Sequence, residues 1–243
     1  TLNSLVHKLL HASEVVPIGR AHLFHLRVAL KAAKSNQGRL AYLGAKAVKE
    51  LAWWASQLDN AEACESHGVP FASRSDFPTS GDDTIVQYSD ASRETDEPAA
   101  SGFGAWAVIA GVFVFVEGRW TAEEVRRYSI NVLEAWARDI PARRFLTYAR
   151  SVGLRPTHSL AYVDNSTAEC IAESGRATTE GLHQLNAERQ QWLIDEGIHQ
   201  SNERVASVDN DVADLLSRGD VEEALRFPAA SGLPVLRLAV EVE

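Results

Sequence analysis

The sequence predicts an α/β fold in which a mixed five-stranded sheet is flanked by helices and preceded by a small all-helical module. Two patterns along the chain support this prediction. Apolar residues recur at helical spacing over residues 3–59, whereas strand-like runs rich in β-branched and aromatic residues begin at Thr84. From Thr84 onward the expected order is three strands, a helix, a strand, two helices, a strand and a helix, which is typical of α/β domains.

The first 60 residues make up the predicted helical module. Their apolar positions fit two or three helices, which are broken first at Pro17 and Gly19 and again over residues 36–38. The segment that follows lacks sustained periodicity and is predicted to be a linker. The predicted domain ranges are therefore 1–60 for the helical module, 61–83 for the linker, 84–220 for the α/β domain and 221–243 for a C-terminal tail.

Three strands open the α/β domain. Residues 84–90 form the first, and residues 102–109 and 112–117 form a hairpin that turns at Ala110 and Gly111. Because these strands follow one another through short connections, we expect them to be antiparallel neighbours.

Helices and strands then alternate. Residues 129–153 have a helical pattern, and Pro141 is expected to kink or split this helix because proline removes an internal hydrogen bond. Residues 159–164 form the fourth strand, reached by this helical crossover. The remaining predicted elements are helices at 167–173 and 179–196, a polar strand at 198–206 and a last helix at 212–218.

Charge is unevenly spread along the chain. The net charge is −9, yet residues 1–60 hold eight Lys and Arg against three Asp and Glu, and all five lysines lie there. The basic N-terminal part is therefore the better candidate for binding a phosphate backbone.

Composition excludes several classes of protein. No uninterrupted apolar stretch approaches the ~20 residues that a bilayer span requires, so we expect no membrane partner. Cys64 and Cys170 form no C-x-x-C motif or disulfide framework, which favours a reducing, intracellular location in cytoplasm or nucleus. The chain contains no methionine, and we expect it to be a fragment or a processed piece.

Four acidic residues follow in the order Asp90, Glu134, Asp164 and Asp214. Asp90 and Asp164 each end a predicted strand, and an acid at the carboxyl end of a strand lies at the rim of a sheet. Helices can bring Glu134 and Asp214 to the same rim. Because four close carboxylates repel one another, they favour a cation, and hard Mg²⁺ or Mn²⁺ takes oxygen ligands.

Such a site predicts a definite chemistry. Two divalent ions about 4 Å apart clamp the attacking water and the leaving oxygen in the displacement of a phosphodiester. The acids therefore indicate metal-dependent phosphodiester hydrolysis. The alternative is that some of the four are ordinary solvated acids, which is the default for any one carboxylate in a chain with 33 of them.

Four sequence blocks surround these acids. They read Tyr88-Ser-Asp-Ala-Ser, Ser129-Ile-Asn-Val-Leu-Glu-Ala-Trp-Ala, Tyr162-Val-Asp-Asn-Ser-Thr-Ala and Asn210-Asp-Val-Ala-Asp-Leu-Leu-Ser-Arg. In this order they resemble the ribonuclease H domain of retroelement reverse transcriptases, closest to those of DIRS-type retrotransposons. The resemblance implies a ribonuclease H-like fold and an endonuclease that hydrolyses the RNA strand of RNA/DNA hybrids.

The same resemblance implies roles for single residues. The metal-binding, catalytic residues would be the four acids Asp90, Glu134, Asp164 and Asp214, holding two Mg²⁺ ions for which Mn²⁺ can substitute. Asn131 matches a position that touches the minor groove of the hybrid, and Ser129 matches a hydroxyl that contacts phosphate.

Residues 1–59 resemble the thumb or connection segment that precedes ribonuclease H in such elements. The matching residues are Val15-Val-Pro-Ile-Gly-Arg, Leu23-Phe-His-Leu and Glu50-Leu-Ala-Trp-Trp. The likeness implies two partners, an RNA/DNA hybrid and an upstream polymerase domain of the same polyprotein.

Neighbouring residues compete for some of these roles. Asp209 and Asp211 lie close to Asp214, but the sequence block favours Asp214, and Asp209 is expected to cap the last helix. His199 is expected at the start of a strand as an ordinary surface histidine rather than in a mobile loop before the last acid. The alternative function is a catalytically silent or domesticated ribonuclease H-fold module that binds nucleic acid or protein without cutting.

Overall fold

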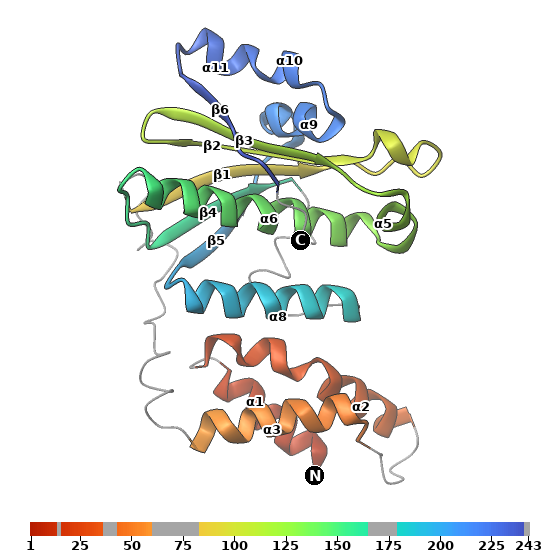
Figure 1. Cartoon of the computed structure of the whole chain (residues 1–243). Helices are drawn as coiled ribbons and strands as arrows, with labels where there is room; N and C mark the ends of the chain where they lie inside the picture. The colour runs from red at the N-terminus through yellow and green to blue at the C-terminus, as the bar shows by residue number, and fades with distance from the viewer. Residues whose placement is uncertain (14–15, 36–42, 60–82, 165–178, 241–243) are drawn as a thin grey trace. The chain divides into compact units, whose positions relative to one another are not determined.

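The computed structural model describes residues 1–13, 16–35, 43–59, 83–164 and 179–240 (Figure 1). The chain divides into two units. One contains Thr1–Phe77 and Ser174–Asp195, and the other contains Pro78–Glu173 and Glu196–Glu243. The predicted helix at 167–173, the break at 36–38 and nearly all of the linker at 61–83 lie outside the described residues. Within the described parts, no helix combines the length and apolar character that crossing a membrane requires.

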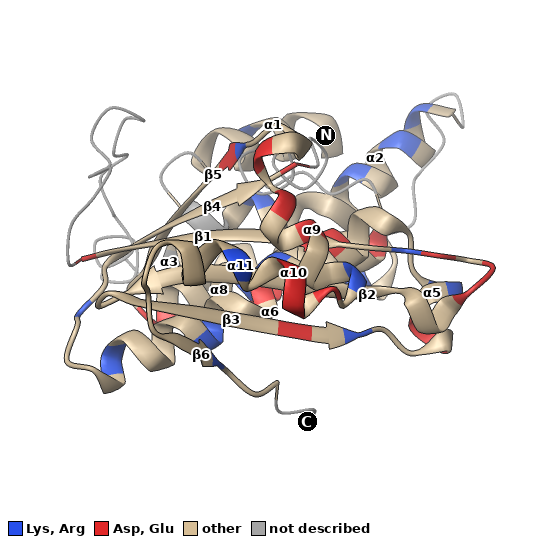
Figure 2. Cartoon of the chain, turned by 90° about the horizontal axis from the view of Figure 1, so that it is seen from above, with Lys and Arg blue, Asp and Glu red and all other residues tan. Residues whose placement is uncertain are grey.

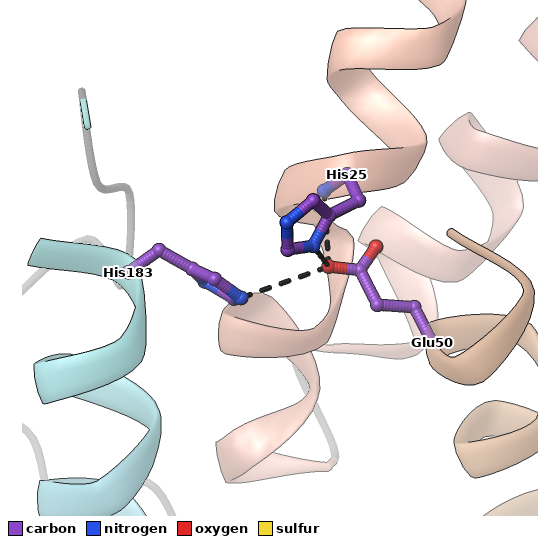
Figure 3. Close-up of side chains that lie close together, drawn as sticks. All are labelled: His25, Glu50 and His183. Carbon is purple, nitrogen blue, oxygen red and sulfur yellow. Dashed lines mark hydrogen bonds and ion pairs between the residues drawn. The ribbon is translucent and has the colours of Figure 1, made fainter. Parts of the chain in front are cut away.

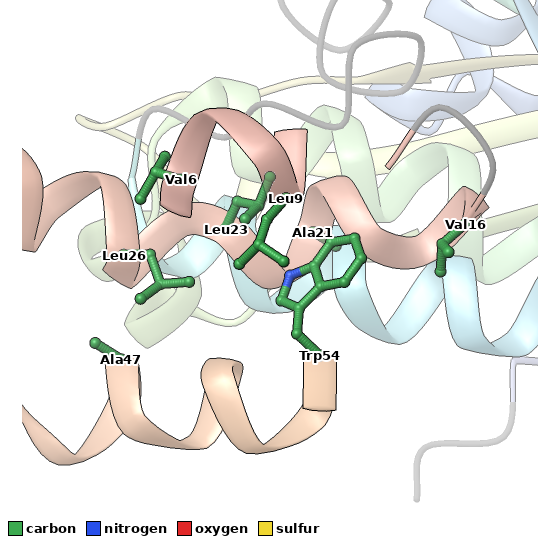
Figure 4. Close-up of a cluster of buried hydrophobic side chains, with 8 residues drawn as sticks. All are labelled: Val6, Leu9, Val16, Ala21, Leu23, Leu26, Ala47 and Trp54. Carbon is green, nitrogen blue, oxygen red and sulfur yellow. The ribbon is translucent and has the colours of Figure 1, made fainter. Parts of the chain in front are cut away.

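In its described residues the first unit has helices and no strand, as the sequence predicts for its N-terminal part. It contains α1 (Leu2–Ala12), the 3₁₀ helix η1 (Pro17–Leu23), α2 (Phe24–Ser35), α3 (Ala45–Asp59) and α8 (Glu180–Asp195). Their apolar faces share one core, whose buried members are Val6, Leu9, Val16, Ala21, Leu23, Leu26, Ala47 and Trp54 (Figure 4).

Trp54 is the largest side chain of this core. It is 1% exposed, and its indole N–H donates to the His22 carbonyl over 3.0 Å. A Cβ at Gly19 would lie 2.4 Å from the indole ring, so the close packing requires glycine there. One of the paired tryptophans is thus a core residue, as the helical spacing predicts.

A six-stranded mixed sheet forms the second unit, in the order β5-β4-β1-β2-β3-β6. Strands β1, β2 and β3 are antiparallel neighbours, whereas β4 is parallel to β1, β5 to β4 and β6 to β3. The strands are β1 (Thr84–Ala91), β2 (Gly102–Ile109), β3 (Val112–Arg119), β4 (His158–Val163), β5 (His199–Arg204) and β6 (Val235–Arg237).

The hairpin between β2 and β3 turns where the sequence predicts. Ala110 and Gly111 both have positive φ, 52° and 75°, which the right-handed twist of a two-residue hairpin requires. Gly111 adopts this conformation readily, whereas Ala110 is the one non-glycine residue with positive φ in the described parts of the chain.

Helices cover both faces of the sheet (Figure 1). Helix α6 (Ile130–Ser151) packs on β1 and β2 from one side, and α9 (Asp211–Arg218) packs on the same strands from the other. Pro141 lies inside α6 without dividing it, so the expected split does not occur. Only one internal hydrogen bond is lost at a proline, and burial of Pro141 and its neighbours in the core favours the continuous helix.

Several elements differ from the sequence prediction. The sheet has six strands rather than five, because β6 from the predicted C-terminal tail pairs with β3. Its three residues are all exposed, and a strand this short offers too few positions for a periodic pattern in the sequence. A short helix, α5 (Ala122–Arg127), was also missed, although Thr121 and Glu124 form a capping box at its start.

The remaining short elements complete the second unit. They are the 3₁₀ turns η3 (Pro98–Ala100) and η4 (Ser207–Asp209) and the helices α10 (Val221–Ala224) and α11 (Arg226–Ala230).

The unit boundaries do not follow chain order, since α8 groups with the N-terminal helices. The predicted domain ranges themselves stay predictions.

Charged residues are distributed differently on the helices of the two units (Figure 2). Helix α2 carries the basic residues Arg27, Lys31 and Lys34. Helix α9 instead carries Asp211 and Asp214 in its first turn. The chain is therefore basic on one of its N-terminal helices and acidic beside the end of the sheet.

Candidate active site

Asp90 is the last residue but one of β1 and is 5% exposed. Its Oδ2 accepts a hydrogen bond of 2.7 Å from the Ser217 hydroxyl on α9. Burial raises the pKa of Asp90 from its ordinary value of 3.8 to about 6, and the charges of Asp164 and Asp214 also raise it. The hydrogen bond from Ser217 acts in the opposite direction and favours the carboxylate.

Glu134 reaches the same place from α6. Its side chain is 5% exposed, and it accepts a hydrogen bond from the Ala91 backbone N–H. Burial raises the pKa of Glu134 well above its ordinary value, and the negative charges of Asp90 and Asp164 raise it further. A helix that crosses β1 and β2 thus presents an acid at the end of the first strand.

Asp164 follows β4 directly and is half-buried. Because β4 is parallel to β1, with Tyr162 beside Tyr88, both strands end at the same edge of the sheet. Its Oδ2 accepts a hydrogen bond of 3.1 Å from the Ser207 hydroxyl, just before α9.

The structure brings three of the four predicted acids together. One carboxylate oxygen from each of Asp90, Glu134 and Asp164 lies within 4.8 Å of the other two. Asp214 does not join this group. Its two carboxylate oxygens accept from the Arg218 Nε at 2.9 and 3.0 Å, and its side chain is 43% exposed.

The three grouped acids fit a hard divalent cation. Two of them, Asp90 and Glu134, are buried, and burial together with the negative charge of Asp164 raises the pKa of both, so their ionised forms need positive charge nearby. Carboxylate oxygens are the ligands that Mg²⁺ and Mn²⁺ prefer. The same donor set offers no sulfur or imidazole that would select a softer metal.

The two predicted substrate-binding residues lie at the start of α6, one turn before Glu134. Ser129 is the exposed N-cap residue, and its side chain makes no capping hydrogen bond. Asn131 is half-buried in the first turn. Both positions belong to the helix that carries Glu134, so their spacing from the acids is fixed by that helix.

The structure also places two residues, Asp209 and His199, that the sequence analysis weighed beside the four acids. Asn210, not Asp209, is the N-cap residue of α9, so the capping role predicted for Asp209 is wrong. Asn210 instead donates from its amide to the Ser89 carbonyl and so ties α9 to β1.

His199 begins β5 beside His158, at the opposite end of the parallel strands from Asp164. Burial and the charge of His158 lower the pKa of His199.

Three further residues shape the site and were assigned no role from the sequence. Ser217 and Ser207 donate hydroxyl hydrogen bonds to Asp90 and Asp164, and Arg218 pairs with Asp214. Ser217 and Arg218 are the last two residues of the fourth sequence block, and their place in that block is the only sequence feature that could have indicated a role for them.

Neither a protein-family model nor a curated protein matches the chain. Several solved structures do match the chain. The RNase H1 of Halobacterium salinarum NRC-1 matches at 19% identity and a TM-score of 0.41, over 59% of this chain and 98% of that one. LC11-RNase H1 in complex with an RNA/DNA hybrid matches at 16% identity and a TM-score of 0.43, over 58% and 99%. The foamy viral protease-reverse transcriptase with RNA/DNA hybrid matches at 10% identity and a TM-score of 0.36, over 78% and 28%.

The second unit has the strand topology expected for a ribonuclease H-like domain. Its mixed sheet has three antiparallel strands, two further strands parallel to the first, and helices on both faces. This is the fold class that the sequence predicts, with β6 added at one edge.

Proposed function

We propose that this chain is a metal-dependent endonuclease that hydrolyses the RNA strand of RNA/DNA hybrids. The observation that carries the proposal is the convergence of Asp90, Glu134 and Asp164 at one end of the sheet, with one oxygen of each within 4.8 Å of the others. The resemblance of the four acidic sequence blocks to those of ribonuclease H domains supports this substrate class. Their likeness to retroelement reverse transcriptases, and to DIRS-type elements in particular, supports a role beside an upstream polymerase domain.

Asp90, Glu134 and Asp164 would hold the metal, with two Mg²⁺ ions in the complete site and Mn²⁺ able to replace them. When bound, the metal supplies a nucleophile from water near neutral pH and offsets charge on the leaving oxygen. Ser217 and Ser207 hold the carboxylates of Asp90 and Asp164 in fixed orientations. Asp214, whose side chain is 43% exposed, would become the fourth ligand by leaving Arg218.

Substrate recognition would rest on shape and on 2′-hydroxyl groups, so sequence preference should be weak. Ser129 has a hydroxyl that no capping bond uses, and this suits contact with a phosphate. Asn131 would reach into the minor groove of the hybrid from the same helix. The basic residues of α2 would add attraction to the phosphate backbone.

Cleavage of an end-labelled hybrid tests the proposal. With Mg²⁺, the parent should cut the RNA strand of the hybrid, leave its DNA strand intact, and spare single-stranded RNA and duplex DNA. Asp90→Asn should abolish this cleavage, whereas Asp209→Asn, at an exposed position near the same site, should retain it. Absence of cleavage by the parent with either Mg²⁺ or Mn²⁺ would defeat the proposal.

One observation favours a second candidate, a catalytically silent module with this fold. Asp214 is paired with Arg218 rather than grouped with the other three acids, and a site with an incomplete ligand set binds metal more weakly. If the chain is a silent module, the parent and Asp90→Asn should bind the hybrid with the same affinity. Neither protein should cut it.

A further inference from the structure

A second cluster of metal-ligand side chains lies inside the helical unit, apart from the acids of the sheet. His25 on α2, Glu50 on α3 and His183 on α8 point toward one another (Figure 3). One ring nitrogen of each histidine and one oxygen of Glu50 lie within 4.8 Å of each other. All three residues belong to the same compact unit, although His183 is far from the other two in the sequence.

Glu50 Oε1 is the centre of this cluster. It lies 2.9 Å from His25 Nδ1 and 3.7 Å from His183 Nε2. The Glu50 side chain is 5% exposed, and those of His183 and His25 are 12% and 20% exposed. The site is therefore a largely buried group of two imidazoles and one carboxylate.

Helix capping explains only part of this arrangement. The Glu50 carboxylate accepts backbone N–H groups from His25 and Leu26, each over 2.9 Å, and so satisfies the start of α2. These bonds fix the orientation of the carboxylate. They do not explain why His183 Nε2 faces it from α8 at 3.7 Å, beyond hydrogen-bonding distance.

A second carboxylate completes the pattern around His25. The other ring nitrogen, Nε2, is buried and makes no hydrogen bond, and Glu180 Oε1 lies 3.7 Å from it. Glu180 in turn forms an ion pair with Lys46. A histidine that binds a metal through one nitrogen directs its second N–H toward a carboxylate in this way, which fixes the tautomer and the ring.

We propose that His25 Nδ1, Glu50 Oε1 and His183 Nε2 form a Zn²⁺ site. Two imidazoles and one carboxylate are an established zinc ligand set, whereas Mg²⁺ prefers oxygen alone. The three ligands leave a fourth position for water or another donor. Since they come from α2, α3 and α8, the bound ion would join α8 to the N-terminal helices of its own unit.

Zinc titration of the full chain in excess Mg²⁺ tests this site. The parent, Asp90→Asn and His11→Gln should each bind one Zn²⁺ at a site that His183→Gln weakens by at least about 100-fold. His11 is an exposed histidine of α1 and serves as the matched control. Glu180→Gln should weaken binding about tenfold, because it removes only the partner of a ligand. Equal zinc affinity in His183→Gln and the parent, or no zinc bound by the parent at micromolar concentration, overturns the proposal.

A spectroscopic measurement uses only the parent protein, so it tests the proposal even if His183→Gln fails to fold. X-ray absorption of the zinc-loaded parent should show two imidazole ligands and oxygen ligands at about 2.0–2.1 Å. A spectrum with oxygen ligands only would place the zinc at the acids of the sheet and overturn the assignment.

Discussion

At the scale of single residues, burial determines the electrostatics of the acid cluster. Asp90 and Glu134 are each 5% exposed, and burial is the largest cause of their raised pKa values. The sequence identifies these acids because Asp90 ends a predicted strand and Glu134 lies in a predicted helix, each within a characteristic sequence block. It does not identify Ser217 as the partner of Asp90, because 127 residues separate the two and only the packing of α9 on the sheet joins them.

Asp90→Asn should stabilise the metal-free protein at pH 7. The folded pKa of Asp90, about 6, exceeds its ordinary value of 3.8, so ionisation disfavours the folded state. This penalty is absent below pH 3.8, grows as the pH rises to about 6 and is then constant. We expect the variant to gain about 3 kcal/mol at pH 7 and almost nothing at pH 3.5.

Thermal or urea unfolding in EDTA at both pH values measures this gain. Asp209→Asn, an exposed acid nearby, should show little change at either pH. A gain for Asp90→Asn that is the same at pH 3.5 and pH 7 would show that ionisation of the buried Asp90 carboxyl is not its cause.

Asp214→Asn should impair cleavage less than Asp90→Asn. Asp90 lies in the buried group, and its loss should cost several kcal/mol of transition-state stabilisation, or about 1,000-fold in rate. Asp214 is 43% exposed and paired with Arg218, so we expect about a tenfold loss. Single-turnover cleavage of a hybrid in Mg²⁺ gives both values. Equal losses would contradict the expectation that Asp214 contributes less to cleavage than the three grouped acids.

At the scale of elements, close packing of α9 on the sheet brings the Ser217 hydroxyl to Asp90. Gly102 and Gly104 of β2 allow this approach, since a Cβ at either would lie within 3 Å of α9 backbone atoms. The strand and helix types were predictable because their periodicities differ. The sixth strand and the continuous α6 were not, because β6 is only three residues long and the tolerance of Pro141 depends on burial.

Gly104→Ala should destabilise the sheet unit and lower cleavage. The new Cβ would lie 2.3 Å from Leu216 Cβ and 2.6 Å from the Ser217 backbone nitrogen, so α9 must shift. We expect a loss of about 2–3 kcal/mol in the free energy of unfolding. Gly181→Ala meets no atom within 4 Å and should be neutral or slightly stabilising. Chemical denaturation of both variants measures the difference, and equal stabilities would contradict the packing argument.

At the scale of the whole molecule, the two units differ in charge as well as in architecture. The N-terminal 60 residues are basic within a chain of net charge −9, and Lys31 and Lys34 are exposed on α2. Composition and periodicity predicted a separate helical module. They did not predict that α8, which follows β4 in the sequence, would group with it, because that depends on tertiary contacts.

Hybrid binding should depend strongly on salt, and α2 should contribute to this dependence. Replacing Lys31 and Lys34 together by alanine should reduce the slope of log affinity against log salt by up to about 2, since each phosphate contact contributes about 0.9. Binding isotherms of Asp90→Asn in EDTA, at salt concentrations from about 50 to about 200 mM, give the slopes without cleavage. An unchanged slope would remove α2 from the binding surface.

The central claim is that Asp90, Glu134 and Asp164 hold the divalent metal that this chain uses. A crystal structure of the parent soaked with Mn²⁺ tests it most directly, because anomalous scattering locates the ion. We predict a manganese peak among these three carboxylates, and its loss in Asp90→Asn. A well-ordered cluster with no peak, or manganese bound only at other places, would contradict the account.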